Sequence, residues 1–247
     1  MNLLTVDHVT KVFTQRKIFE DASFYLQEQE KVGVIGINGT GKSTLLKMIA
    51  GIEEPDSGEV IYANQIVVHY LPQMPEFDPD ATVLESVLAY ACVGSVHKES
   101  NKDEHEMWNL ESSAKSMMTK LGIYDFDEKT GHLSGGQKKR LALVAVLLTP
   151  CDVLLLDEPT NHLDAEMAEW LENYLKNYRG AMIMVTHDRY FLDNVCNRIV
   201  EVDHGKIYSY ETNYSGYLEA RAQRIESMEV GERKRQAFLK KEIEWIR

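Results

Sequence analysis

Residues 36–44, Gly36-Ile37-Asn38-Gly39-Thr40-Gly41-Lys42-Ser43-Thr44, decide the fold of this chain. They match the pattern G-x-x-x-x-G-K-[ST] at every constrained position. An apolar run, Val32–Ile35, precedes the loop and predicts a buried strand, and a helix-forming run, Thr44–Ala50, follows it. A glycine loop between a strand and a helix is the context that a phosphate-binding loop requires. We therefore predict that the chain binds a nucleoside triphosphate.

The residue types of this loop suit that chemistry. Glycines let backbone N–H groups turn toward a phosphate, and the following helix N-terminus adds partial positive charge. Lys42 is expected to reach the β- and γ-phosphates, and the Ser43 hydroxyl to ligate Mg²⁺. The predicted nucleotide-binding residues of the loop are Gly36, Asn38, Gly39, Thr40, Gly41, Lys42, Ser43 and Thr44.

A second motif lies far downstream, where the apolar run Cys151–Leu156 ends in Asp157 and Glu158. Ligands of parallel sheets bind at the carboxyl ends of the strands. We therefore expect Asp157 to act on the Mg²⁺ through water, and Glu158 to orient or deprotonate the attacking water.

A third motif, Leu133-Ser134-Gly135-Gly136-Gln137, is predicted to open a helix that runs to about Thr149. A helix N-terminus with a serine hydroxyl and bare backbone suits an anion. Ser134 could equally be an N-cap without a ligand. The order of the three motifs favours the anion-binding interpretation.

Together these motifs resemble those of ATP-binding-cassette (ABC) ATPases, and the resemblance covers about residues 1–205. It implies an ATPase with ATP and Mg²⁺ as cofactors. It also implies roles for Gln73 as a Mg²⁺ and water contact, for His187 as a contact of the γ-phosphate, and for Phe13 as an aromatic stacked on adenine. The implied catalytic residues are Glu158, His187, Lys42 and Gln73, and the implied metal-binding residues are Ser43, Gln73 and Asp157.

The same resemblance implies that the nucleotide site closes only against a second cassette. In that arrangement, the nucleotide of the partner cassette would be bound by Ser134, Gly135, Gly136 and Gln137. Residues 161–164, which follow Asp157 and Glu158, resemble the D-loop of these ATPases. Hydrolysis by an isolated cassette is expected to be weak.

Apolar strand-like runs alternate with helical runs, so we predict an α/β fold with a mixed sheet. The resemblance refines this to an ABC-type P-loop core with a mixed or antiparallel β subdomain, a helical subdomain at about residues 76–149, and a C-terminal helical extension. Residues 1–212 form the predicted ATPase domain, and residues 213–247 form the start of a truncated interdomain linker. This linker is predicted to be an amphipathic helix weakened near Gly231.

The formal charge of −12 gives no global case for nucleic-acid binding. Residues 221–247 nevertheless hold eight Arg and Lys against five Glu, a basic tail on an acidic body. The N-terminus shows no signal-peptide pattern, and no apolar run approaches the roughly 20 residues of a membrane span. We therefore expect a cytoplasmic protein without a membrane span.

Two further runs resemble the ABC-F proteins, soluble ATPases with two cassettes in one chain: Thr186-His187-Asp188-Arg189-Tyr190-Phe191-Leu192-Asp193 and Tyr214-Ser215-Gly216-Tyr217-Leu218-Glu219. The resemblance implies action on the ribosome, in translation regulation or in protection against antibiotics. The partners would be a second cassette, in the same full-length chain or in a homodimer, and ribosomal RNA and tRNA through the linker. The short interval between Gln73 and Leu133 favours the Uup-like branch. The alternative is the ATP-binding subunit of an ABC membrane transporter.

Overall fold

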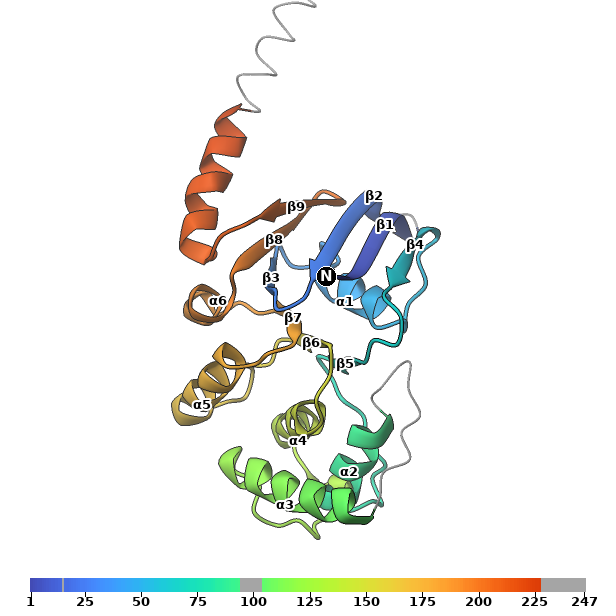
Figure 1. Ribbon diagram of the computed structural model, residues 1–247, viewed down its shortest axis with the longest axis vertical. Helices are drawn as coiled ribbons and strands as arrows, with labels where there is room; N and C mark the ends of the chain where they lie inside the picture. The colour runs from blue at the N-terminus through green and yellow to red at the C-terminus, as the bar shows by residue number, and fades with distance from the viewer. Residues whose placement is uncertain (15, 94–103, 228–247) are drawn as a thin grey trace, which may run out of the picture.

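The structure, a computed structural model, describes residues 1–14, 16–93 and 104–227 (Figure 1). Two sheets and two groups of helices make up the fold. The strands are β1 (Asn2–Phe13), β2 (Arg16–Gln27), β3 (Lys31–Ile35), β4 (Ser57–Tyr62), β5 (Val68–Leu71), β6 (Val153–Asp157), β7 (Ala181–Val185), β8 (Arg198–Asp203) and β9 (Lys206–Tyr210). The helices are α1 (Lys42–Ile49), α2 (Val83–Val93), α3 (Glu104–Lys120), α4 (Gly135–Leu148), α5 (Ala165–Lys176) and α6 (Arg189–Val195), with a 3₁₀ turn at Thr130–His132.

The central sheet has the strand order β5-β6-β7-β3-β8-β9. Its neighbours are parallel except for the β8–β9 hairpin, which is antiparallel. Residues of β6 alternate between two cores: Val153 and Leu155 pack with α1, whereas Leu154 and Leu156 pack with α4. Strands buried on both faces must be apolar at every position, which explains the continuous apolar runs in the sequence.

A second, antiparallel sheet has the order β2-β1-β4 and shares the core of α1. The predicted α/β fold with a mixed sheet and an antiparallel subdomain is therefore confirmed. The strand-like alternation of the sequence near Leu3–Val6 predicts only the first part of the first strand, because β1 runs on to Phe13. Register shifts between Val6 and Val9 and a positive φ of 48° at His8 interrupt the alternation from which the strand was predicted.

The helices α2, α3 and α4 gather below the central sheet, apart from the antiparallel sheet at the opposite end (Figure 1). The core of this group is α4, in which every residue from Leu141 to Leu148 is buried. A helical segment that is covered on all sides has no polar face, so residues 141–148 are apolar throughout. None of the helices in the described part of the chain is long and apolar enough to cross a membrane.

Residues 214–227 form a helix beside β9, drawn in orange-red in Figure 1. Its Tyr217 ring is buried and meets the Tyr210 ring edge to face, with centroids 5.1 Å apart. The predicted weak point at Gly231 and the basic residues beyond it lie outside the described residues. The first part of the extension is therefore packed on the cassette.

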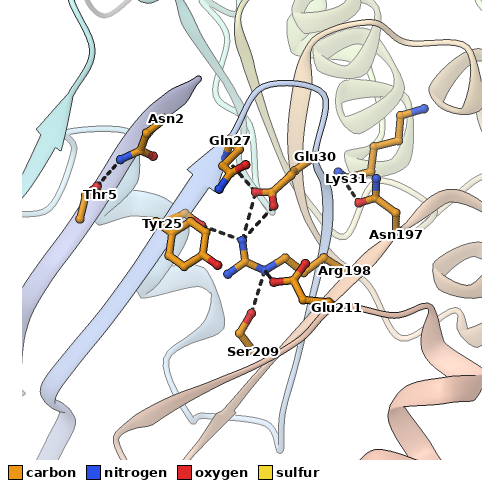
Figure 2. A network of polar contacts seen from close by, with 10 residues as sticks. All are labelled: Asn2, Thr5, Tyr25, Gln27, Glu30, Lys31, Asn197, Arg198, Ser209 and Glu211. Carbon is orange, nitrogen blue, oxygen red and sulfur yellow. Dashed lines mark hydrogen bonds and ion pairs between the residues drawn. The ribbon is translucent and has the colours of Figure 1, made fainter.

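The two sheets are linked at the amino ends of the central strands by Arg198, the first residue of β8 (Figure 2). Its guanidinium is 1% exposed and lies over the Tyr25 ring, 4.2 Å from the centroid. It donates to the Tyr25 carbonyl at 3.0 Å and to the Ser209 hydroxyl at 2.7 Å, and it pairs with Glu30 at 3.0 Å. Glu211 adds a second ion pair at 3.1 Å. This cluster joins β2, β8 and β9.

Candidate functional site

The phosphate-binding loop connects β3 to α1 at the carboxyl end of the central sheet. Gly41 has a φ of +105°, and a Cβ there would lie 2.3 Å from Ile18 Cγ2. A Cβ at Gly36 would lie 2.5 Å from the Val202 carbonyl oxygen. The Thr40 hydroxyl donates to the Ile37 carbonyl at 2.9 Å and closes the turn. The loop conformation thus requires glycine at two of its constrained positions.

Lys42 is the first residue of α1, and its side chain returns over the loop. Its Nζ donates to the Gly36 carbonyl at 2.8 Å and to the Ile37 carbonyl at 3.3 Å. Burial lowers the pKa of Lys42, and the negative charges of Glu158 and Asp157 oppose this effect. Lys42 and the acid pair are therefore close enough to interact electrostatically, although they lie far apart in the sequence.

Asp157 ends β6 and is 1% exposed. Neither of its carboxylate oxygens has a hydrogen-bonding partner among the described residues. Burial raises the pKa of Asp157, and the Ser43 hydroxyl and the nearby lysines oppose that rise, Lys139 first among them. Buried carboxylates without partners are costly, and oxygen ligands suit Mg²⁺. Asp157 and Ser43 therefore fit a hard divalent cation.

Glu158 follows Asp157 in a left-handed conformation, with a φ of 53°. Its backbone N–H donates to the Val185 carbonyl at 2.8 Å, which places it beside the end of β7. Its carboxylate lies 3.4 Å from His187 Nε2. Burial raises the pKa of Glu158, and the neighbouring His187 lowers it. Strained backbone of this kind occurs at functional sites, and a carboxylate with a raised pKa is suited to proton transfer.

The third predicted motif, residues 133–137, forms a turn at the N-terminus of α4, which we call the signature turn, and α4 is the signature helix. Ser134 Oγ accepts a hydrogen bond from the Gln137 N–H at 3.3 Å, and Gln137 Oε1 accepts one from the Ser134 N–H at 2.9 Å. This is a capping box, so Ser134 is the N-cap of α4. Gly136 faces His162, because a Cβ at Gly136 would lie 3.2 Å from the His162 Cβ. Anion binding by Ser134, Gly135, Gly136 and Gln137 stays a prediction.

Two predicted residues stand apart from the cluster of Lys42, Asp157, Glu158 and His187. Gln73 is exposed and makes no hydrogen bond within the described residues. Phe13 ends β1 with 43% of its surface exposed, and the Lys11 ammonium lies 5.2 Å from its ring centroid. Next to it, a cavity of about 280 Å³ lies between Arg16 and loop residues 37–40.

Two charged residues of this region were not predicted from the sequence. Lys139 is 3% exposed and donates to the carbonyl oxygens of Pro72 and Asp157. Its helical phase could have identified it, because Lys139, Leu143 and Val146 share one face of α4. Glu201 on β8 is also 3% exposed, and no local pattern marked it.

Glu201 joins the helix of residues 214–227 to the cassette. Its carboxylate pairs with Arg221 at 2.7 Å and with Arg224 at 2.7 Å, and it accepts from the Tyr210 hydroxyl at 3.1 Å. Glu201 lines a cavity of about 410 Å³ together with Lys42, His187 and Tyr217. Two arginines of the predicted basic tail are thus engaged within the protein.

Comparison with known proteins agrees with this geometry. A family model described as "ABC transporter" matches residues 19–161, and a second model with the same description matches residues 200–247. The "Uncharacterized ABC transporter ATP-binding protein YfmR" of Bacillus subtilis is 40% identical over 100% of this chain and 43% of its own length. The "Energy-dependent translational throttle protein EttA" of Haemophilus influenzae is 39% identical over 98% of this chain and 49% of its own length.

The chain therefore spans less than half the length of these curated relatives. Among solved structures, a dimeric ATP-binding cassette in a post-hydrolysis state with ADP and Pi matches with a TM-score of 0.71, at 22% identity, over 85% of this chain and 98% of that one. This likeness shows a shared fold. The chain belongs to the ATP-binding-cassette (ABC) family, and its named relatives are consistent with an ABC-F cassette.

Proposed function

We propose that this chain is the ATP-binding and ATP-hydrolysing cassette of an ABC-F protein that acts on the ribosome, in translation regulation or ribosome protection. The named throttle relatives support this proposal, since they align with 98% or more of the chain at 37–39% identity. Their name refers to translation, and the likeness includes the residues beyond the cassette.

The observation that carries the proposal is the docked helix of residues 214–227. Besides the Glu201 contacts, its Ser215 backbone N–H and hydroxyl both donate to Asp193, at 2.8 and 3.0 Å. Asp193 lies on α6, the helix that follows His187. A linker packed against α6, directly after His187, is suited to transmit the nucleotide state of the cassette to a partner outside it.

In this proposal ATP binds between Phe13 and the phosphate loop, where Gly36, Asn38, Gly39, Thr40, Gly41 and Thr44 surround its phosphates. Lys42 neutralises phosphate charge, Glu158 orients the nucleophilic water, and His187 positions the γ-phosphate. Ser43, Gln73 and Asp157 would hold Mg²⁺, which would supply further charge neutralisation on the phosphates.

A second cassette completes the site in this proposal. The turn at Ser134, Gly135, Gly136 and Gln137 would cover the nucleotide of that partner, and the partner's equivalent turn would cover the nucleotide held here. ATP would then close the two cassettes and hydrolysis would release them, a two-state switch. Hydrolysis by the isolated cassette is accordingly expected to be weak.

The test is co-sedimentation of the full-length protein carrying Glu158→Gln with ribosomes, with and without ATP at moderate salt. This variant is expected to bind ATP without hydrolysing it, so ATP should increase pelleting with ribosomes. The matched control carries Lys42→Ala as well, and it should lose the ATP effect. If ATP binds but no ribosome association follows, the ribosomal function is wrong. A membrane-protein pull-down would then test the transporter subunit.

A further inference from the structure

Lys139 occupies an unusual position for a lysine. It lies one turn into α4, within the basic run Lys138-Lys139-Arg140 that follows the signature turn. Of these three residues only Lys139 is buried. Buried ammonium groups are retained where they are paired or hydrogen-bonded, because the loss of hydration is otherwise too costly. The partners of this ammonium therefore indicate its role.

Those partners lie on two neighbouring strands. In the parallel pair β5–β6, Leu71 is opposite Leu156, so Pro72 and Asp157 are the next residues along each strand. Lys139 Nζ donates to the Pro72 carbonyl at 2.5 Å and to the Asp157 carbonyl at 2.6 Å. A single ammonium thus joins α4 to the carboxyl ends of both strands.

The residues that follow these two carbonyls are Gln73 and Glu158, both assigned to the reaction above. The charges of Asp157 and Glu158 favour the protonated form of Lys139, whereas burial lowers its pKa to about 8. Lys139 makes no hydrogen bond to the side chain of Gln73 or Glu158 within the described part of the chain. Its hydrogen bonds hold the backbone carbonyls that directly precede these two residues. A shift of α4 would move both backbones together.

We propose that Lys139 is a positioning residue for ATP hydrolysis, which sets the backbone of Gln73 and of the acid pair relative to the signature helix. This inference rests on the proposed ATPase function. Misplacing catalytic groups by about 1 Å costs on the order of a hundredfold in rate without touching the chemistry itself. A purely structural lysine would instead change stability and leave the turnover of each folded molecule intact.

The experiment compares Lys139→Met, Lys139→Arg and Lys138→Met in the intact polypeptide. Lys138→Met is the matched control, because Lys138 is the neighbouring lysine on the same helix turn and is only partly buried, and its side chain makes no hydrogen bond among the described residues. Titration with a fluorescent ATP analogue counts folded sites and gives the nucleotide Kd. Steady-state hydrolysis then gives kcat per titrated site and KM, independently of ribosomes.

We expect Lys139→Met to lower kcat by about ten- to a hundredfold with the nucleotide Kd within about threefold of wild type. Lys139→Arg should recover part of kcat, since it keeps a cation and several donors, and Lys138→Met should match wild type.

A kcat of Lys139→Met within about twofold of wild type would overturn the positioning role of Lys139 and leave the proposed ATPase function standing. If Lys139→Met does not fold, the folded Lys139→Arg variant decides: wild-type kcat together with wild-type KM at every Mg²⁺ concentration would refute positioning. Absence of turnover in the wild type would instead overturn the ATPase function and this inference together.

Discussion

Arg198 and Asp157 are buried to the same degree, but the protein treats their charges in opposite ways. Both are 1% exposed and both lie on the central sheet. Arg198, at the amino end of its strand, has Glu30, Glu211, Ser209 and the Tyr25 carbonyl as partners (Figure 2). Asp157, at the carboxyl end of its strand, has no hydrogen-bonding partner for its carboxylate oxygens among the described residues.

This difference separates Arg198, a structural charge, from Asp157, the carboxylate that we propose acts on Mg²⁺. Compensation within the protein makes Arg198 part of the scaffold that joins two sheets. A buried carboxylate without a hydrogen-bonding partner costs stability even where lysines such as Lys139 offset part of that cost, and it is retained where a ligand supplies the missing partner. The amino end of the sheet is therefore closed by protein groups, and the carboxyl end is available for chemistry. The following predictions test this contrast, in order of decreasing effect.

Removal of Arg198 should have the largest effect on stability. Arg198→Met leaves Glu30 partly buried without its cation, and breaking a buried pair from one side costs about 3–5 kcal/mol. Urea denaturation should show this loss, and the folded fraction should still bind ATP with the wild-type Kd. The control is Lys206→Met, an exposed change on β9 that should leave the denaturation midpoint within experimental error. A wild-type denaturation midpoint for Arg198→Met would show that the ion pairs and hydrogen bonds of Arg198 do not stabilise the fold.

Glu201 is a second buried charge with partners inside the protein, and its loss should loosen only the helix of residues 214–227. Glu201→Gln removes the negative charge that binds Arg221 and Arg224, and hydrogen bonds to charged groups contribute roughly 1–3 kcal/mol. We expect faster hydrogen exchange in residues 214–227 with little change in β3 and β6. Glu219→Gln, on the exposed side of the same helix, is the matched control. Equal exchange in both variants would show that Tyr217 packing and the Ser215–Asp193 contacts hold this helix in place without the Glu201 ion pairs.

Neutralising Asp157 should slightly stabilise the protein in the absence of nucleotide. Asp157→Asn removes a buried charge whose desolvation outweighs the stabilising effect of the nearby lysines, and relief of this kind is worth about 0.5–2 kcal/mol. The variant should in turn lose the additional stability that Mg-ATP gives the wild type, about 2.7 kcal/mol at a ligand concentration of 100 Kd. Urea denaturation with and without Mg-ATP measures both effects.

Asp152→Asn is the matched control for that prediction. It lies just before β6, and its carboxylate accepts a hydrogen bond from the Val67 N–H at 2.7 Å. Its neutralisation should give no gain in stability and should leave the Mg-ATP effect intact. A stabilised Asp152→Asn variant would mean that net acidity, and not the missing partner at Asp157, explains the gain.

Much of the fold and of the cluster at its centre could be predicted from short runs of residues. The strand before Gly36 and the helix after Ser43 follow from local apolar runs and from glycine's freedom at positive φ. Strand bounds are hardest to predict where the backbone departs from regular geometry, as at His8 in β1 and Asp21 in β2, both with positive φ. A single irregular residue changes the side-chain alternation that a sequence pattern relies on.

The sequence by itself determined the phosphate loop, the apolar strand that ends in Asp157 and Glu158, and the family, because each depends on residues adjacent in the chain. Only the tertiary structure decided that Lys139 is buried, that Arg198 is compensated and that Glu201 holds the C-terminal helix. The partners concerned are 67 residues apart for Lys139 and Pro72, and 168 for Arg198 and Glu30. Whether a charge is buried and paired depends on which distant segments meet around it, and no local pattern contains that information.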